Sequence, residues 1–245
     1  MENRTEIGMN RTGMQVSPLQ MKKMEEVTKL TQPSSEGDAD ALAALRATYI
    51  QEADPLGSVP PPATVKGVAK TGMQMLGGKR PQVFLDKLGE RLAFERGGTR
   101  LYDALIGKCA LPQEGPEVVS LEKLRHFRED EAQHFALVRD CIVQLGGDPT
   151  AQTPCANLAG IEAMGLMQVV TDPKTTVVQS LHAILVAELA DNAAWEELVM
   201  LAREMGQEEM AARFEEAAGH EREHLDHIKA WHLEATLQEA NARAH

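Results

Sequence analysis

Four segments of this chain carry apolar residues at alternating steps of three and four, and each apolar stripe is broken near its middle by a glutamate. That spacing keeps a stripe on one face of a helix. It predicts four helices, at 82–107, 119–145, from 171–176 to near Gly206, and 207–240. The residues that break the stripes are Glu95, Glu131, Glu188 and Glu221. Because an unpaired buried carboxylate is costly, either the stripes are misassigned or cations lie among the glutamates.

Two of these glutamates begin the same short motif. "EAQH" spans 131–134 and "EREH" spans 221–224, so a histidine follows each glutamate by three residues and shares its helix face. The other two glutamates are also matched, because an aromatic residue follows each of them seven positions later. One ExxH motif is common in a Glu-rich chain, but a repeated motif with repeated partners is specific. We therefore predict six metal ligands: Glu95, Glu131, His134, Glu188, Glu221 and His224.

The chemistry of this ligand set indicates the metal. Carboxylates supply hard oxygen ligands and imidazoles supply borderline nitrogen ligands, a combination suited to iron or manganese. Four negative charges balance two divalent cations, and the remaining coordination positions can take O2, peroxide or water. The residues alone leave open whether the cofactor is two iron ions or two manganese ions.

The lengths of the connections predict the fold. The first and second helices, and the third and fourth, are joined by short loops, whereas a long link at 147–173 separates the two pairs and contains a possible short helix, "NLAGIEAMGLMQVV". We expect an all-α four-helix bundle with one long crossover, covering 81–245. Residues 1–80 form an N-terminal extension, partly helical or irregular: polar and irregular over 1–37, a short helix at roughly 40–52, and a Pro-rich break at 54–64.

The ligand pattern resembles the ferritin-like di-metal carboxylate superfamily, which includes bacterioferritins and rubrerythrins, and the resemblance covers about 82–235. It implies that Glu95 and Glu188 each bind one metal, that the two ExxH glutamates bridge, and that the two ExxH histidines each cap one metal. It also implies that Tyr102 is the catalytic tyrosine beside the site and that Asp130 is an outer partner. We expect a ferritin-like fold, and oxidation of Fe(II) or reduction of O2 or H2O2 in the manner of a ferroxidase or a rubrerythrin-like peroxidase.

This sequence departs from the family pattern in two places. Ala132 stands where bacterioferritins carry a haem-ligating methionine, so no haem is expected, and the chain has no CxxC pair for a rubredoxin domain. Asp191 matches an extra carboxylate ligand of rubrerythrins, and we expect it to act as an outer or solvent partner. Two other functions stay open: a manganese catalase-like or monooxygenase-like enzyme, and a non-enzymatic helical scaffold with 1–80 as a docking arm.

Several further residues have less decided roles. His227 and His232 fall off the stripe and are expected at the surface, while the role of His220 is undecided. Gly97 and Gly98, beside the first ligand, are unfavourable inside a helix. They permit close packing, a bulge or an open channel at the site.

Charge and composition restrict the partners. The net charge is −12, and residues 81–245 hold 15 basic and 28 acidic residues, so nucleic acid is not expected as a partner. The sequence has no apolar run of membrane-spanning length and no secretory h-region. Three cysteines without a CxxC pair indicate free thiols in a reducing compartment. We therefore expect a cytoplasmic homo-oligomer, a dimer in the first instance, that binds Fe(II) and O2 or H2O2.

Overall fold

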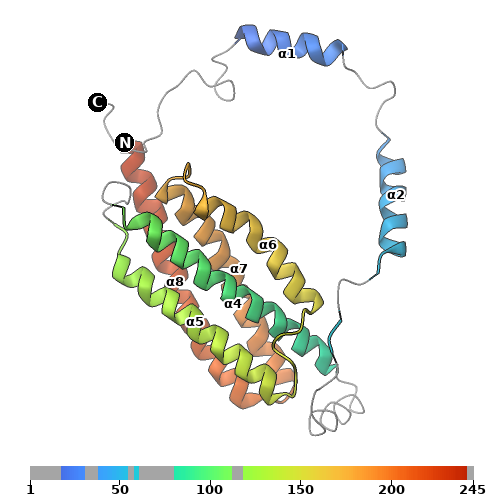
Figure 1. Cartoon of the computed structure of the whole chain (residues 1–245), viewed down its shortest axis with the longest axis vertical. Helices are drawn as coiled ribbons and strands as arrows, with labels where there is room; N and C mark the ends of the chain where they lie inside the picture. Colours follow the sequence, from blue (N-terminus) through green and yellow to red (C-terminus); the bar gives the residue numbers. More distant parts are fainter. Residues whose placement is uncertain (1–17, 31–37, 55–57, 61–79, 112–117, 242–245) are drawn as a thin grey trace. The chain divides into compact units, whose positions relative to one another are not determined.

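The computed structural model describes residues 18–30, 38–54, 58–60, 80–111 and 118–241, which form seven helices and no strand (Figure 1). The prediction of an all-α protein is therefore confirmed over this part of the chain. The chain divides into two compact units, one spanning Arg4–Asp54 and the other containing Pro55–His245. Most of the short loop predicted between the first two helices, at 111–117, lies outside the described residues, as do the segment at 61–79 and most of the Pro-rich break.

The smaller unit contains α1 (Pro18–Leu30) and α2 (Ala39–Glu52). The expectation that 1–37 is irregular is wrong for 18–30, because this stretch is rich in Leu, Met, Lys and Glu, which favour helices. Its proline occupies the first helical position, where a missing N–H costs nothing. The helix predicted at 40–52 is confirmed, and the Asp38 carboxylate caps it by accepting hydrogen bonds from two backbone N–H groups at 3.0 Å.

The described residues of the larger unit form five helices. They are α4 (Pro81–Cys109), α5 (Leu121–Gln144), α6 (Pro154–Thr171), α7 (Val177–Glu204) and α8 (Glu208–Asn241). The four predicted long helices are confirmed, with ends that differ by a few residues. Helix α4 packs against α5, α6 and α7, and α7 packs against α8, whereas α5 and α8 contact each other mainly through side chains, along most of the length of α5 (Figure 1).

The long link is more ordered than expected. Where the sequence suggested a short helix at 157–170, α6 has 18 residues and begins at Pro154 after a Thr153 cap. It packs along α4 and α7, and its length returns the chain to the end of the unit at which α5 began. Hydrophobic contacts on one side explain why this connection is a full helix: Val170 is buried, and Leu166 and Met167 pack against the core.

Two apolar clusters fill the space between the long helices. The first is formed near the start of α4 and α8 and the end of α5 and α7, around Phe84, Val138, Trp195 and Phe214. The second is formed at the opposite ends of the same four helices, around Leu105, Phe127, Leu181 and Ile228. Helices α4 and α8 therefore run in one direction and α5 and α7 in the other. In each of these four helices buried charged residues lie between the two clusters, at one level.

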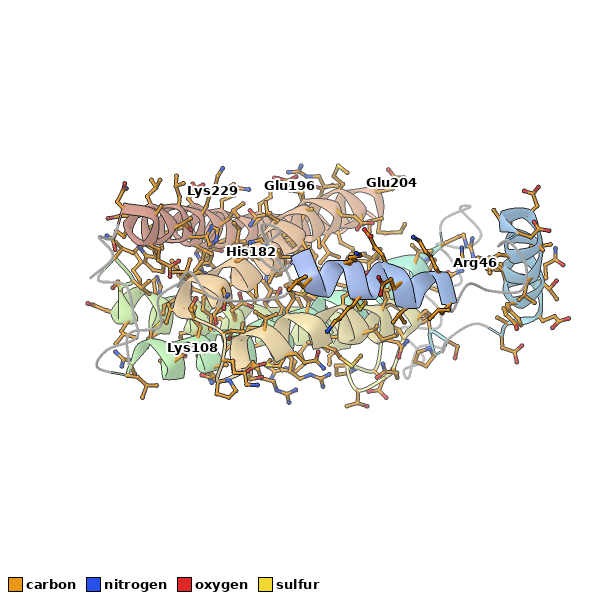
Figure 2. The ribbon with its side chains drawn as sticks, turned by 90° about the horizontal axis from the view of Figure 1, so that it is seen from above. Arg46, Lys108, His182, Glu196, Glu204 and Lys229 are labelled. Carbon is orange, nitrogen blue, oxygen red and sulfur yellow. The ribbon has the colours of Figure 1, made fainter. Side chains whose placement is uncertain are left out.

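Charged residues lie on the outside of this unit. Figure 2 labels Glu196, Glu204 and Lys229 on the outward faces of α7 and α8, and all three are exposed. Lys108 ties the end of α4 to the connection before α7, because its Nζ donates to Thr175 Oγ1 at 2.6 Å and to Ser180 Oγ at 3.0 Å. None of the described helices combines the length and the hydrophobicity needed to cross a bilayer. The three cysteines are free, as expected.

Candidate metal centre

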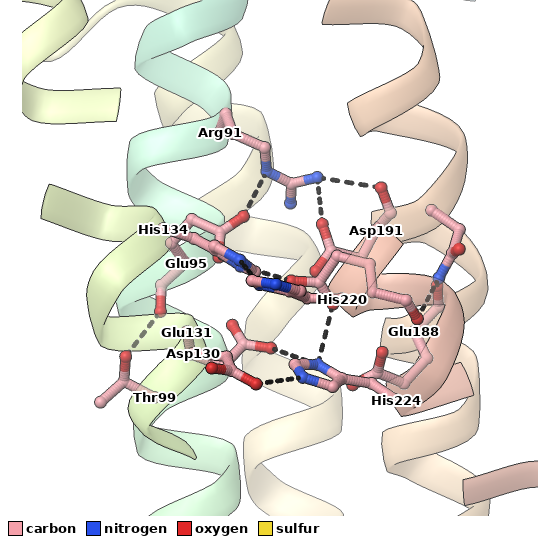
Figure 3. Close-up of polar contacts among 12 residues, drawn as sticks. Arg91, Glu95, Thr99, Asp130, Glu131, His134, Glu188, Asp191, His220 and His224 are labelled. Carbon is pink, nitrogen blue, oxygen red and sulfur yellow. Dashed lines mark hydrogen bonds and ion pairs between the residues drawn. The ribbon is translucent and has the colours of Figure 1, made fainter. Parts of the chain in front are cut away.

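The six predicted ligands come together in one buried cluster at the level between the two apolar clusters (Figure 3). Helix α4 contributes Glu95, α7 contributes Glu188, and α5 and α8 each contribute one ExxH pair. No member is more than 4% exposed. The apolar stripes were therefore assigned correctly, and the glutamates that break them do face the interior.

Ligand atoms within this cluster fall into overlapping groups in which all atoms lie within 4.8 Å of one another. We call Glu131, Glu188, Glu221 and His224 the His224 position, and we call Glu95, His134 and Glu221 the His134 position. A third group contains Glu95, Glu131, Asp191 and Glu221. Glu221 belongs to all three groups, which places its carboxylate between the two histidines.

Several nitrogen and oxygen atoms in this cluster lie close together without forming hydrogen bonds. Nδ1 of His134 lies 2.6 Å from Glu221 Oε1, and Nδ1 of His224 lies 3.0 Å from Glu221 Oε2. These contacts are within ion-pair distance, but neither nitrogen and neither oxygen is in hydrogen-bond geometry. Among the described residues, every buried side-chain polar atom without a hydrogen bond lies in this cluster or directly against it. Buried polar atoms normally have hydrogen-bond partners, so this concentration of carboxylate oxygens and imidazole nitrogens without such partners fits a site that binds cations.

A buried arginine that was not predicted from the sequence, Arg91, pairs with two carboxylates of the cluster. Arg91 is 2% exposed, and its Nε lies 2.9 Å from Glu95 Oε1. Its guanidinium also pairs with the side chain of Asp191 and donates to the Asp191 backbone carbonyl at 3.2 Å (Figure 3). Asp191 is therefore a buried ion-pair partner, so of the two roles expected for it, that of a solvent partner is wrong and that of an outer partner stays a prediction. The available signal was the spacing, because Arg91 precedes Glu95 by four residues on the same helix face.

Each of the two histidines predicted to be ligands, His134 on α5 and His224 on α8, has an outer partner on the other of these two helices. His224 Nε2 donates to Asp130 Oδ2 at 3.1 Å, which is the outer role expected for Asp130. His134 Nε2 shares a hydrogen bond of 3.3 Å with His220 Nδ1, and the two rings are stacked. Thus His220, whose role the sequence left undecided, contacts the predicted ligand His134. His227 and His232 are partly buried rather than fully at the surface, since each packs against another aromatic ring.

Other neighbours fix the positions of individual glutamates. The buried hydroxyl of Tyr102 donates to Glu188 Oε1 at 2.5 Å. A Cβ added to Gly98 would lie 2.6 Å from Cδ of Glu131, so only glycine leaves room for that carboxylate. The same addition at Gly97 would meet only ordinary contact at 3.9 Å. Of the three roles considered for this glycine pair, close packing is the one the structure supports, and it applies to Gly98.

Burial and mutual repulsion shift the titration of these groups. Burial, opposed by the charge of Arg91, raises the pKa of Glu95 to about 7. Burial and the charge of Glu221 raise the pKa of Glu188 to about 8 and that of Glu131 well above its ordinary value. Burial also tends to raise the pKa of Glu221, but its contacts with the two histidines outweigh that effect and hold the pKa below the ordinary value. Without cations, therefore, the cluster retains protons at neutral pH.

His224 responds in the opposite way to its surroundings. Burial favours the neutral ring, but the hydrogen bond to Asp130 and the contact with Glu221 raise its pKa to about 10. The same hydrogen bond, acting against burial, lowers the pKa of Asp130. Burial and the charge of Glu188 keep Tyr102 neutral, because they raise the pKa of its hydroxyl well above the ordinary value. Tyr102 is thus a hydrogen-bond donor beside the cluster.

Comparison with known protein families, with curated proteins and with solved structures finds no match for this chain. The resemblance to the ferritin-like superfamily therefore depends on the ligand residues and their spacing. Independently of that resemblance, the chain has a buried cluster of carboxylates and imidazoles that could hold a metal ion.

Proposed function

We propose that this protein is a di-iron carboxylate protein with a ferritin-like bundle, which oxidises Fe(II) or reduces O2 or H2O2. The observation that carries the proposal is a balance of charge. Five buried carboxylates and one guanidinium make up the cluster, so four negative charges remain among them when all are ionised; a sixth buried carboxylate, Asp130, pairs with the outer nitrogen of His224. Two divalent cations neutralise the remaining negative charges of the cluster, and the two imidazole Nδ1 atoms that lack hydrogen bonds supply one nitrogen ligand each. The five carboxylates are those of Glu95, Glu131, Glu188, Asp191 and Glu221.

Bound iron would supply one-electron redox chemistry and coordination positions for an oxidant. The residues of the chain have distinct parts in this proposal. Asp130 holds His224 so that its Nδ1 faces the carboxylates, an arrangement common around metal-bound histidines. Tyr102 donates a hydrogen bond to Glu188 and orients that carboxylate. The apolar clusters on both sides keep bulk water from the ligands.

The test begins with metal-free, full-length protein under anaerobic conditions. Fe(II) is added, bound iron is measured, and O2 or H2O2 is then supplied while oxidation is followed by absorbance. We expect about two irons per chain, the number that this ligand motif binds, and oxidation that is faster than in buffer. Replacing both bridging candidates, Glu131→Gln with Glu221→Gln, should abolish binding and rapid oxidation.

The matched control is Glu216→Gln, which removes one exposed carboxylate from α8 and should change neither result. Failure of the native protein to bind iron, or equal oxidation by the double variant, would contradict the proposal. Stoichiometric manganese with O2 release from peroxide would instead indicate a catalase-like enzyme, since the same ligands suit both metals.

A further inference from the structure

The two ligand histidines have different outer partners. Both turn Nδ1 toward the carboxylates and Nε2 toward the other helix of the α5–α8 pair. For His224 the outer partner is the carboxylate of Asp130, and for His134 it is the imidazole of His220. A carboxylate partner makes a ligand imidazole more basic and fixes its tautomer. A second imidazole carries no such charge, so His134 is the weaker of the two nitrogen ligands.

The glutamates at the two positions also differ. Glu188, at the His224 position, accepts a hydrogen bond from the neutral hydroxyl of Tyr102. Glu95, at the His134 position, has the guanidinium of Arg91 at 2.9 Å. A cation bound there must share this carboxylate with a positive charge that is already present. Asp191 offsets part of the repulsion, but it is itself paired with the same guanidinium.

Access to solvent separates the two positions further. His224 is 0% exposed and its outer partner Asp130 is buried. His220 is exposed, and its ring stacks on that of His134 with centroids 5.5 Å apart and planes inclined by 19°. The exposed imidazole of His220 therefore lies between His134 and the surface on the side of the α5–α8 pair (Figure 3).

We propose that the two cation positions are unequal. The His224 position binds its cation first and tightly, whereas the His134 position is exchangeable and receives its cation from the surface through His220. This inference rests on the proposed function, because it presupposes two bound cations.

The test is a titration of the metal-free, full-length protein with Co2+, which is stable in air and reports its ligands through its visible absorption. We expect two equivalents in two steps, the first at least about tenfold tighter than the second, since outer partners of metal-bound histidines contribute about 10–100-fold to affinity. Asp130→Asn should weaken the first step by that factor. His220→Ala should weaken the second step and slow its filling, while the first step keeps its affinity and spectrum.

One substitution separates a ligand-tuning role from a merely structural one. His220→Asp supplies a carboxylate oxygen near the place of the imidazole Nδ1, so it should tighten the second step beyond that of the native protein. His232→Ala, which removes another histidine from α8 where it contacts only His182 among the described rings, is the control and should leave both steps unchanged.

The outcomes distinguish this inference from the function on which it rests. Two equivalents bound in a single step, or an unaltered second step in both His220 variants, would overturn the inference while the di-metal proposal stands. Absence of Co2+ binding by the native protein would overturn both.

Discussion

The six predicted ligands lie at one level between the two apolar clusters, and we call this the ligand level. The ligand level and the two clusters are built from the same four helices with the same stripe spacing, but they are held together differently. In the clusters, Phe214 and Leu105 are fully buried by other apolar side chains, and the contact itself is favourable. At the ligand level the buried carboxylates lose hydration and repel one another, and without cations burial, together with the charge of Glu221, raises the pKa values of Glu95 and Glu188. Stability should therefore be independent of metal in one region and dependent on it in the other.

The largest effect on stability is expected in an apolar cluster. Phe214→Ala removes a fully buried ring from the cluster around Trp195, and a large aromatic-to-alanine change costs about 3–5 kcal/mol. Chemical denaturation should show the same loss of unfolding free energy with chelator and with added metal. A loss that disappears when metal is present would mean that this cluster is not independent of the ligand level.

The next largest effect is the loss of stabilisation by metal when one glutamate at the ligand level is replaced. Glu131→Gln resembles the protonated carboxyl that burial and the charge of Glu221 favour at this position, so the metal-free protein should unfold at nearly the native temperature. The stabilisation by metal, about 2.7 kcal/mol at a metal concentration 100 times Kd, should be lost. Thermal unfolding with and without metal measures both quantities. An unchanged response to metal would contradict a bridging role for this glutamate.

Substitution of Gly98 should have a smaller effect on stability, and substitution of its neighbour Gly97 is the matched control. Gly98→Ala forces the Glu131 carboxylate to move, and overpacking of this kind costs about 1–3 kcal/mol. Gly97→Ala has room at 3.9 Å and gains helix propensity of about 1 kcal/mol. Only the Gly98 variant should also weaken metal binding. Equal metal affinity in the two variants would show that the Glu131 carboxylate is not confined by Gly98.

The smallest effect is a gradual dependence on pH. Glu95 and Glu188 keep protons in the metal-free fold up to about pH 7 and 8, whereas unfolding restores an ordinary pKa near 4.5. The folded state then binds more protons than the unfolded state, so the metal-free protein loses stability as pH rises through this window. Metal must displace the same protons, and each displaced proton strengthens binding about tenfold, or about 1.4 kcal/mol, per pH unit. Calorimetry between pH 6 and 8 should show proton release, and affinity that does not change with pH would contradict it.

The helices and the interior position of the ligands could be predicted from the sequence because both follow from periodicity. Steps of three and four fix which side of a helix a residue faces, and the same steps carry the glutamates and histidines inward. Helix α6 was underestimated because its apolar residues give no strong stripe, and it is stabilised by packing on α4 and α7. Helix α1 was missed because it is a short, mostly polar segment of 13 residues that was not distinguished from the polar sequence on either side of it.

The partners around the ligands were harder to predict. Arg91 was overlooked since an arginine four residues from a glutamate is usually a solvent-exposed pair, and only tertiary packing shows that both are buried. The His134–His220 contact joins two helices and depends on their relative register, which single-helix spacing does not give. The need for glycine at 98 likewise depends on how closely α5 approaches α4.

The central claim, that the ligand level holds two divalent cations, is tested most directly by anomalous diffraction at the iron edge from crystals of the iron-loaded full-length protein. The account predicts two anomalous peaks per chain, one next to Nδ1 of His224 and one next to Nδ1 of His134, with the Glu221 carboxylate between them. Iron found only at surface histidines, or no peak among these six side chains, would contradict it.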